Sequence, residues 1–191
     1  MNNWFSSDIH LGHRKLHDAR KDLLPEGVDH DGYIVNRIFS VVKPGDNYYN
    51  IGDLFWKMPL EKKLEFFNLF KKHKVNFFGI YGNHDKPYPN HKAVVWTGHI
   101  KDIVIEKQPI TLCHYPMMVW NRSHYGAWQL YGHEHLRNKS LENSIPRVDE
   151  TRRLGKQLNV NVEFHNFLPW SFEEVYEVMK TKNDNLDLLK R

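Results

Sequence analysis

The chain has 191 residues, and its 27 Lys and Arg against 23 Asp and Glu give a net charge of +4 with neutral histidines. Hydrophobic residues make up 40% and charged residues 26% of the sequence, which excludes wholesale disorder and predicts one globular domain. No apolar run approaches the roughly 18 residues of a membrane-spanning helix, so we expect no membrane association.

Cysteine content and the first residues bear on the compartment. The single cysteine, Cys113, excludes an internal disulfide framework and fits a reducing environment. Residues 1–6 do not combine a basic region with an apolar stretch, so we expect no secretory signal and a cytoplasmic protein. The 13 histidines direct attention to metal or proton-transfer sites.

The first half of the chain alternates strands and helices. Strands are predicted over 3–7, 47–51 and 75–81, and each runs into a polar loop. Helices are predicted over 32–42, before Pro44-Gly45, and from Pro59 onward. This order is the βαβ pattern, in which functional residues follow the carboxyl ends of buried strands.

Apolar spacing defines the faces of the two helices. Residues three to four positions apart share one face of a helix. The residues expected to face the core are Ile34, Ile38, Val41 and Val42 in the first helix, and Leu60, Leu64, Phe67 and Phe70 in the second.

The second half of the chain contains shorter strands. Residues 101–106, 109–113, 127–131 and 158–164 are predicted strands, and their succession indicates a second, more antiparallel sheet.

The C-terminal part contains one more predicted helix. Ser171 and Glu174 form a capping box at its start, and Val175, Val178 and Met179 provide its apolar face. We expect a single domain over residues 1–180, followed by a frayed polar tail over 181–191.

Polar groups typical of metal sites follow the predicted strands, and glycine often precedes them. Each group alone also fits a turn or a helix cap. Together they offer seven candidate ligands, too many for one tetrahedral ion and about right for two ions that share a carboxylate. The candidate ligands are Asp8, His10, Asp53, Asn83, His114, His133 and His135.

The ordered series Asp-x-His, Gly-Asp, Gly-Asn-His-Asp, His and Gly-His-x-His, within residues 8–135, resembles the calcineurin-like metallophosphoesterase superfamily. Segments 7–13, 42–46, 114–117 and 159–174 are similar to a group of small bacterial and phage phosphoesterases within it. The resemblance implies an α/β fold, a four-layer αββα sandwich with two central mixed β-sheets.

The same resemblance implies a role for each site residue. Asp8, His10 and His135 would hold one ion, Asn83, His114 and His133 a second, and Asp53 would bridge them. A bridging hydroxide would attack phosphorus while His84 acts as general acid, and Asp85 could orient His84. The implied cofactors are two divalent metal ions, manganese first and iron, nickel, cobalt or zinc as alternatives.

Two departures from the motifs of the superfamily exclude particular subgroups. Leu54, Phe55 and Trp56 follow Asp53, without the Asp-Arg-Gly continuation of protein Ser/Thr phosphatases, so that substrate class is not expected. Trp56 stands where the iron-tyrosinate chemistry of purple acid phosphatases would require tyrosine.

Four further residues are candidates for substrate binding. His13 and Arg14 follow the first polar group, and Arg122 and His124 lie between His114 and His133. Arginine suits bidentate phosphate binding, although a solvated helix start and an ordinary polar loop explain the two pairs about as well.

The expected activity is metal-dependent hydrolysis of a phosphoester, more specifically a phosphodiester. The substrate is either a small molecule or a nucleic acid, toward which the net charge leans slightly. The alternative from another class is a catalytically silent, protein-binding scaffold. The sequence does not indicate the natural substrate or the oligomeric state.

Overall fold

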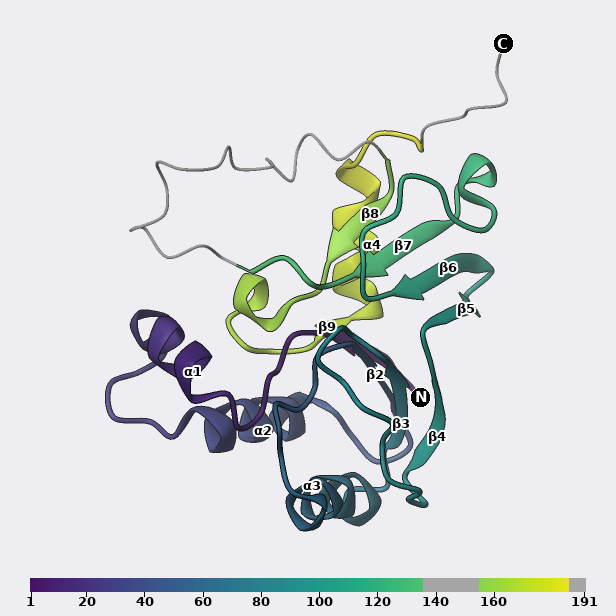
Figure 1. Ribbon diagram of the computed structural model, residues 1–191. Helices are drawn as coiled ribbons and strands as arrows, with labels where there is room; N and C mark the ends of the chain where they lie inside the picture. The colour runs from purple at the N-terminus through teal and green to yellow at the C-terminus, as the bar shows by residue number, and fades with distance from the viewer. Residues whose placement is uncertain (136–154, 186–191) are drawn as a thin grey trace.

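A computed structural model describes residues 1–135 and 155–185 of the chain. In this part of the chain the fold is mixed α/β, with two mixed sheets and four α-helices (Figure 1). The first sheet contains β1 (Asn3–Ser6), β2 (Asn47–Ile51), β3 (Asn76–Ile80), β4 (Val94–Gly98) and β9 (Trp170–Ser171). The second contains β5 (Ile100–Ile105), β6 (Gln108–Cys113), β7 (Trp128–Tyr131) and β8 (Gln157–Asn159).

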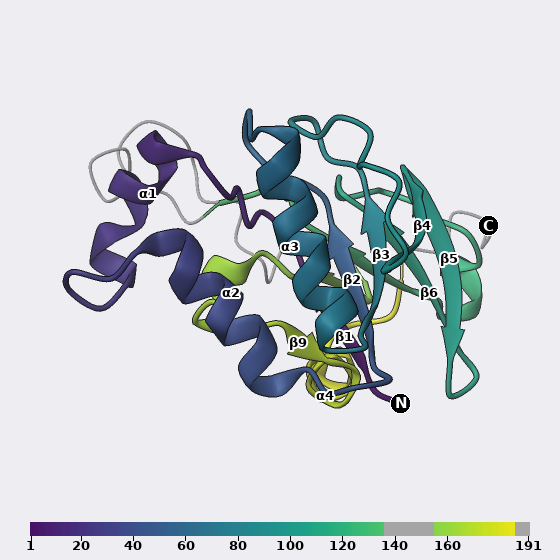
Figure 2. The same ribbon diagram turned by 90° about the horizontal axis from the view of Figure 1, so that it is seen from below.

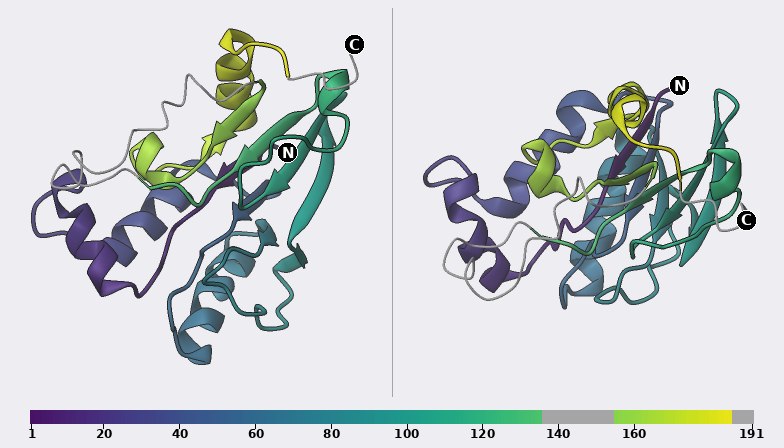
Figure 3. Two further views of the ribbon diagram at one scale, coloured as in Figure 1. Left: turned by 45° about the horizontal axis from the view of Figure 1, so that its top comes forward. Right: turned by 90° about the horizontal axis from the view of Figure 1, so that it is seen from above.

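Helices and short 3-10 turns connect these strands. The α-helices are α1 (Arg14–Arg20), α2 (His30–Val41), α3 (Leu60–Lys72) and α4 (Phe172–Thr181). The 3-10 helices are η1 (Lys21–Leu23), η2 (Ser123–Tyr125) and η5 (Val162–His165). In both views of Figure 3, α1 lies on the opposite side of the molecule from β5 and β6.

Parallel pairing brings the first three strand ends together. The first sheet has the order β4-β3-β2-β1-β9, and β1, β2, β3 and β4 run parallel. Only β9 is antiparallel, at the edge beside β1. The predicted strands at 3–7, 47–51 and 75–81 are confirmed, and their carboxyl ends lie at one edge of the sheet.

The second sheet is less antiparallel than expected. It has the order β5-β6-β7-β8, and only β5 and β6 pair antiparallel. The pairs β6–β7 and β7–β8 are parallel because each connection returns the chain to the starting end of the sheet. As a result, β6 and β7 also end at the same edge.

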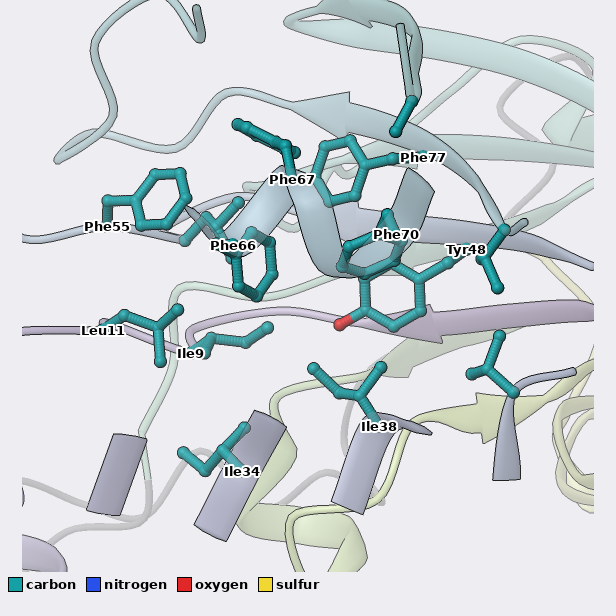
Figure 4. Packing of buried hydrophobic residues seen from close by; sticks show 14 of the residues in the cluster. Ile9, Leu11, Ile34, Ile38, Tyr48, Phe55, Phe66, Phe67, Phe70 and Phe77 are labelled. Carbon is teal, nitrogen blue, oxygen red and sulfur yellow. The ribbon is translucent and has the colours of Figure 1, made fainter. Parts of the chain in front are cut away.

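The helices α2 and α3 cover the outer face of the first sheet (Figure 2). Ile34 and Ile38 of α2 belong there to one cluster with Phe67 and Phe70 of α3, and Phe77 of β3 lies beside the α3 rings (Figure 4). Four α3 and β3 rings meet edge to face or tilted, which is the preferred geometry of aromatic pairs.

A second core lies between the sheets. Tyr48 faces the helices whereas its neighbour Tyr49 faces the second sheet, as alternation along a strand requires. Ile51 and Ile80 of the first sheet pack there with Leu130 of the second. Phe172, Val175 and Met179 of α4 join this cluster. The first sheet therefore packs apolar side chains on both faces, which explains the adjacent aromatic residues in β1, β2 and β3.

Several local predictions were wrong. The helix α1 and strand β4 were not predicted, and Leu60 is 55% exposed instead of facing the core. The predicted strand 158–164 ends at Asn159, and 162–165 forms a 3-10 helix capped by Asn161, whose side chain accepts from the Glu163 backbone N–H.

The C-terminal helix begins at the predicted capping box of Ser171 and Glu174. Beyond this helix, the Asn185 side-chain amide donates to the carbonyls of Ser123 and Ala127. Residues 186–191 of the predicted tail lie outside the described residues. In the described part, no helix has the length and apolar character needed to cross a membrane.

Candidate metal centre

The seven predicted ligands follow strands that end at two neighbouring sheet edges. Asp8 and His10 follow β1, Asp53 follows β2 and Asn83 follows β3. The remaining three histidines follow β6 and β7. The two edges are joined directly, because the His133 backbone N–H donates to both Asp8 oxygens at 3.2 and 3.0 Å.

Asp8, His10 and His135 form the first group. Asp8 Oδ1 lies 3.9 Å from His10 Nε2 and 3.5 Å from His135 Nε2. Their potential ligand atoms all lie within 4.8 Å of one another, close enough for one ion to contact all three.

Asp53 lies between this group and the next. Its Oδ2 is 3.5 Å from His10 Nε2 and 3.4 Å from His114 Nε2. Asp8, Asp53 and His114 also meet the 4.8 Å criterion. One carboxylate thus contacts histidines of both predicted groups, which is the position that a bridging ligand needs.

Asn83, His114 and His133 form the second group. Asn83 Oδ1 is 3.1 Å from His114 Nε2 and 3.0 Å from His133 Nδ1. The structure therefore brings all seven predicted ligands together, in the two groups that the resemblance implied.

The backbone at four of the seven ligands is left-handed and not extended. Asp8, His10, Asp53 and His133 have φ angles of 57, 53, 56 and 71°. This left-handed conformation is uncommon for residues other than glycine and concentrates at functional sites. It directs the side chains into a shared space that straight strand ends would not reach.

Two glycines permit the close approach of these loops. A Cβ on Gly82 would overlap the Asp53 carboxylate, and a Cβ on Gly132 would overlap Asp8 and Ser7. Glycine precedes Asn83 and His133 because any side chain there would displace a carboxylate of the site.

Burial controls the protonation of the group. Burial lowers the pKa of His10 to about 2, so its ring is neutral at pH 7. Burial raises the pKa of Asp8 to about 6. Burial acts to raise the pKa of Asp53, but the hydrogen bond and charge of His114 outweigh it and lower the pKa to about 2.

Several ring nitrogens face carboxylate oxygens across distances of 3.4–3.9 Å. His114 Nδ1 donates to the Ile51 carbonyl at 2.9 Å, which leaves Nε2, 3.4 Å from Asp53 Oδ2, as the nitrogen that a cation would contact in place of a proton. Both ring nitrogens of buried His10 have no hydrogen-bond partner among the described residues. Such groups are costly unless a cation or proton lies between them, so the donor set fits a divalent metal.

His84 lies at the solvent side of the centre. Its Nε2 is 4.0 Å from Asp53 Oδ2, its side chain is 38% exposed, and its backbone N–H donates to Asp53 Oδ1. The ring packs edge to face on Trp56. His84 is thus held beside the ligands while remaining accessible to a substrate.

Asp85 does not orient His84, contrary to the expectation. Its carboxylate accepts hydrogen bonds from the backbone N–H groups of Asp53, Leu54 and Gly82, and from the Tyr88 hydroxyl. Asp85 therefore holds the backbone of the Asp53 loop, because its carboxylate accepts the N–H groups that the loop leaves without a backbone partner.

The predicted substrate residues separate into two pairs. His13 stacks on Trp56 with a centroid distance of 4.1 Å and meets the His10 ring edge-on at 5.6 Å. Arg14 is the exposed first residue of α1. This pair lies next to the centre.

Arg122 and His124 lie away from the centre. They precede β7, and the adjacent Gly126 carbonyl accepts from Gln108, the first residue of β6. Because β6 and β7 are parallel, this loop lies at the opposite end of the sheet from His114 and His133. The placement argues against the predicted substrate contact of Arg122 and His124.

Sequence reasoning missed two buried charged residues. Arg20 is 1% and Glu163 8% exposed, and they pair at 2.7 Å next to Asp8 and His135. Arg20 belongs to no recognisable motif, and Glu163 lies in the 159–174 segment that carries the resemblance but had no role assigned to it. In the sequence, Arg20 lies in a short polar helix and interrupts no apolar pattern, so its role is visible only in the structure.

The sequence is similar to a known protein over part of its length. No family model matches the sequence. The Gene 66 protein of Mycobacterium phage L5 is 30% identical over 88 residues, which are 46% of this chain and 42% of the phage protein. The chain thus matches less than half the length of this relative.

Two solved structures are similar to different degrees. A protein of unknown function from Aquifex aeolicus has a TM-score of 0.68 at 21% identity, and the alignment covers 93% of this chain and 98% of that one. This likeness shows a shared fold. A novel archaeal phosphodiesterase has a TM-score of only 0.38 at 17% identity, over 84% of this chain and 82% of that one.

Proposed function

We propose that this chain is a metal-dependent phosphoesterase of the calcineurin-like type, with the four-layer αββα fold and with phosphodiesters as its substrates. One observation carries the proposal. The buried His10 ring has no hydrogen-bond partner among the described residues and lies between the carboxylates of Asp8 and Asp53. A divalent cation would satisfy the neutral nitrogen and the carboxylate oxygens that face it, and no group of the described residues hydrogen-bonds to that ring.

The donor set would hold two ions. Asp8, His10 and His135 would bind the first, Asn83, His114 and His133 the second, and Asp53 both. Mixed oxygen and nitrogen ligands favour manganese, iron, nickel, cobalt or zinc over calcium and magnesium, and manganese is the ion that we propose among them.

Two such ions supply a nucleophile at neutral pH and neutralise charge on the phosphoryl oxygens. The chain itself positions the reacting groups. Asp53 fixes the spacing of the two ligand groups, and Asp85 holds the Asp53 backbone. His84 donates a proton to the leaving oxygen as its bond to phosphorus breaks, for which its exposed Nε2 beside Asp53 is suited.

The test is a substrate panel on purified protein. The protein is stripped with a chelator and reloaded separately with Mn, Ni, Co, Mg and Zn. We expect bis-p-nitrophenyl phosphate to be cleaved with manganese faster than with magnesium, and the stripped protein to be inactive. Equal turnover by stripped and reloaded protein would contradict the proposal.

The same panel separates the alternatives. Cleavage of single-stranded DNA with a strong salt dependence would identify a nuclease, because phosphate contacts release counterions. Two bound ions without turnover on any phosphoester would identify a protein-binding scaffold on the same fold.

A further inference from the structure

Arg20, the last residue of α1, is buried beneath the centre and uses every N–H group that it has. Nε and Nη2 contact Glu163 Oε1 at 2.8 and 2.7 Å. Nη2 also donates to the Asp8 carbonyl at 2.6 Å, and Nη1 donates to the Ile9 carbonyl and His30 Nε2, both at 3.1 Å. A guanidinium has five N–H donors, so the fork is saturated.

Glu163 continues this network to a predicted ligand. Its Oε1 lies 2.6 Å from His135 Nδ1. An ionised carboxylate only accepts hydrogen bonds, so the proton of the neutral His135 ring must be on Nδ1. The Nε2 lone pair is then free to face Asp8 Oδ1, 3.5 Å away.

The two arms of this network reach two ligands of one group. Arg20 holds the carbonyls of Asp8 and Ile9, where Asp8 has its left-handed φ of 57°. Glu163 sets the tautomer and direction of His135. Both arms depend on a single ion pair, which is buried and hydrogen-bonded on several sides.

We propose that Arg20 and Glu163 are positioning residues for the first ion: Glu163 orients His135 and Arg20 holds the Asp8 loop. The inference rests on the proposed two-metal function. Partners that orient a metal-bound histidine typically contribute 10–100-fold to metal affinity. We do not count Glu163 among the ligands, because its Oε1 faces His135 Nδ1 and Arg20, and its carboxylate is not part of the group formed by Asp8, His10 and His135.

The test compares Glu163→Gln with a matched control, Glu174→Gln. Glu174 is an exposed glutamate that also contacts a histidine, His165 at 3.4 Å, and glutamine is accepted at its position in the capping box. Manganese binding is measured by titration calorimetry. The His135 tautomer is read in the metal-free protein by nitrogen-15 NMR.

We expect Glu163→Gln to bind one of two manganese ions about 10–100-fold more weakly and to lose the strict Nδ1–H tautomer of His135. Glu174→Gln should match the wild type in both measurements. Wild-type affinity together with an unchanged tautomer in folded Glu163→Gln would overturn the inference.

A second variant covers the risk that Glu163→Gln does not fold because it leaves the Arg20 charge unpaired. Glu163→Asp keeps a negative charge opposite Arg20 but shortens the reach of the carboxylate to His135. This variant should therefore fold and still bind the first ion more weakly. Wild-type affinity in folded Glu163→Asp would also overturn the inference. If the wild type itself bound no metal, the proposed function would fail, whereas the tautomer would still report on the Glu163 arm.

Discussion

Two clusters of histidine and aspartate lie near the loop after β1, and their residue types are the same. One is Asp8, His10 and His135, and the other is His17, His30 and Asp31. In each, the potential ligand atoms lie within 4.8 Å of one another. Distance and composition alone therefore do not distinguish them.

The hydrogen bonds of the two clusters distinguish them. The His17 and His30 rings stack at 3.7 Å with an interplanar angle of 17°, and His30 Nδ1 lies 2.9 Å from Asp31 Oδ1. Arg20 can only donate, so His30 Nε2 must accept and its proton must be on Nδ1. An ion on Nδ1 would move that proton to Nε2, against the Arg20 donor.

The comparison shows that a metal centre is marked by unsatisfied ligand atoms as much as by their proximity. His10 has no hydrogen-bond partner among the described residues, whereas His30 has one on each nitrogen. We infer that the second cluster is structural and joins α1 to α2. The following experiments test this difference, in order of decreasing effect.

The largest effect is expected from Asp53→Asn compared with Asp31→Asn. Loss of the bridging carboxylate should weaken metal binding by more than about 100-fold, since even partners of ligands contribute 10–100-fold, and should abolish nearly all turnover. Asp31→Asn should retain the metal. Metal content after dialysis, measured by mass spectrometry, checks both, and equal metal loss in the two variants would remove the distinction.

His84→Ala should affect the rate but not the metal. A positioned general acid contributes about 10²–10⁴-fold, so kcat should fall by that factor with metal content unchanged. His124→Ala, at the other end of the second sheet, is the control and should keep full activity. Wild-type cleavage of bis-p-nitrophenyl phosphate by His84→Ala would show that the role assigned to His84 is wrong.

Metal affinity should fall in acid. Burial raises the pKa of Asp8 to about 6, so a proton competes with the ion below that pH and not above it. His10 does not add to the effect, because burial lowers its pKa to about 2. Between about pH 7 and pH 5 the ionised fraction of Asp8 falls about tenfold, and manganese affinity should fall at least as much, because the carboxylates beside His114 and His135 outweigh burial and raise the pKa of both rings. An affinity that is constant over this range would contradict the prediction.

The smallest effect is expected from His17→Ala. The variant loses the stacking on His30 and one contact with Asp31, and we expect it to be less stable by about 0.5–1.5 kcal/mol. Metal content and turnover should not change. Urea unfolding of the metal-free protein measures the loss of stability. A loss of metal in this variant would mean that the second cluster also binds an ion.

Local pattern was sufficient for most strands and for α2, α3 and the start of α4. Apolar runs with polar loops mark β1, β2 and β3, and the capping box marks Ser171. The pattern failed at β4, whose pairing with β3 is interrupted by a register shift, and at α1, whose seven residues have little apolar periodicity. It also failed for sheet direction, since β6 to β8 pair through long connections.

The sequence by itself determined the candidate ligands, because residues that follow parallel strands meet at one sheet edge and their chemical types are visible in the chain. Only the tertiary structure decided how they are supported. Arg20 meets Glu163 across 143 residues, Asp85 turns to the Asp53 backbone, and Arg122 lies at the far end of its sheet. Such contacts depend on how distant segments pack, and no local spacing encodes that.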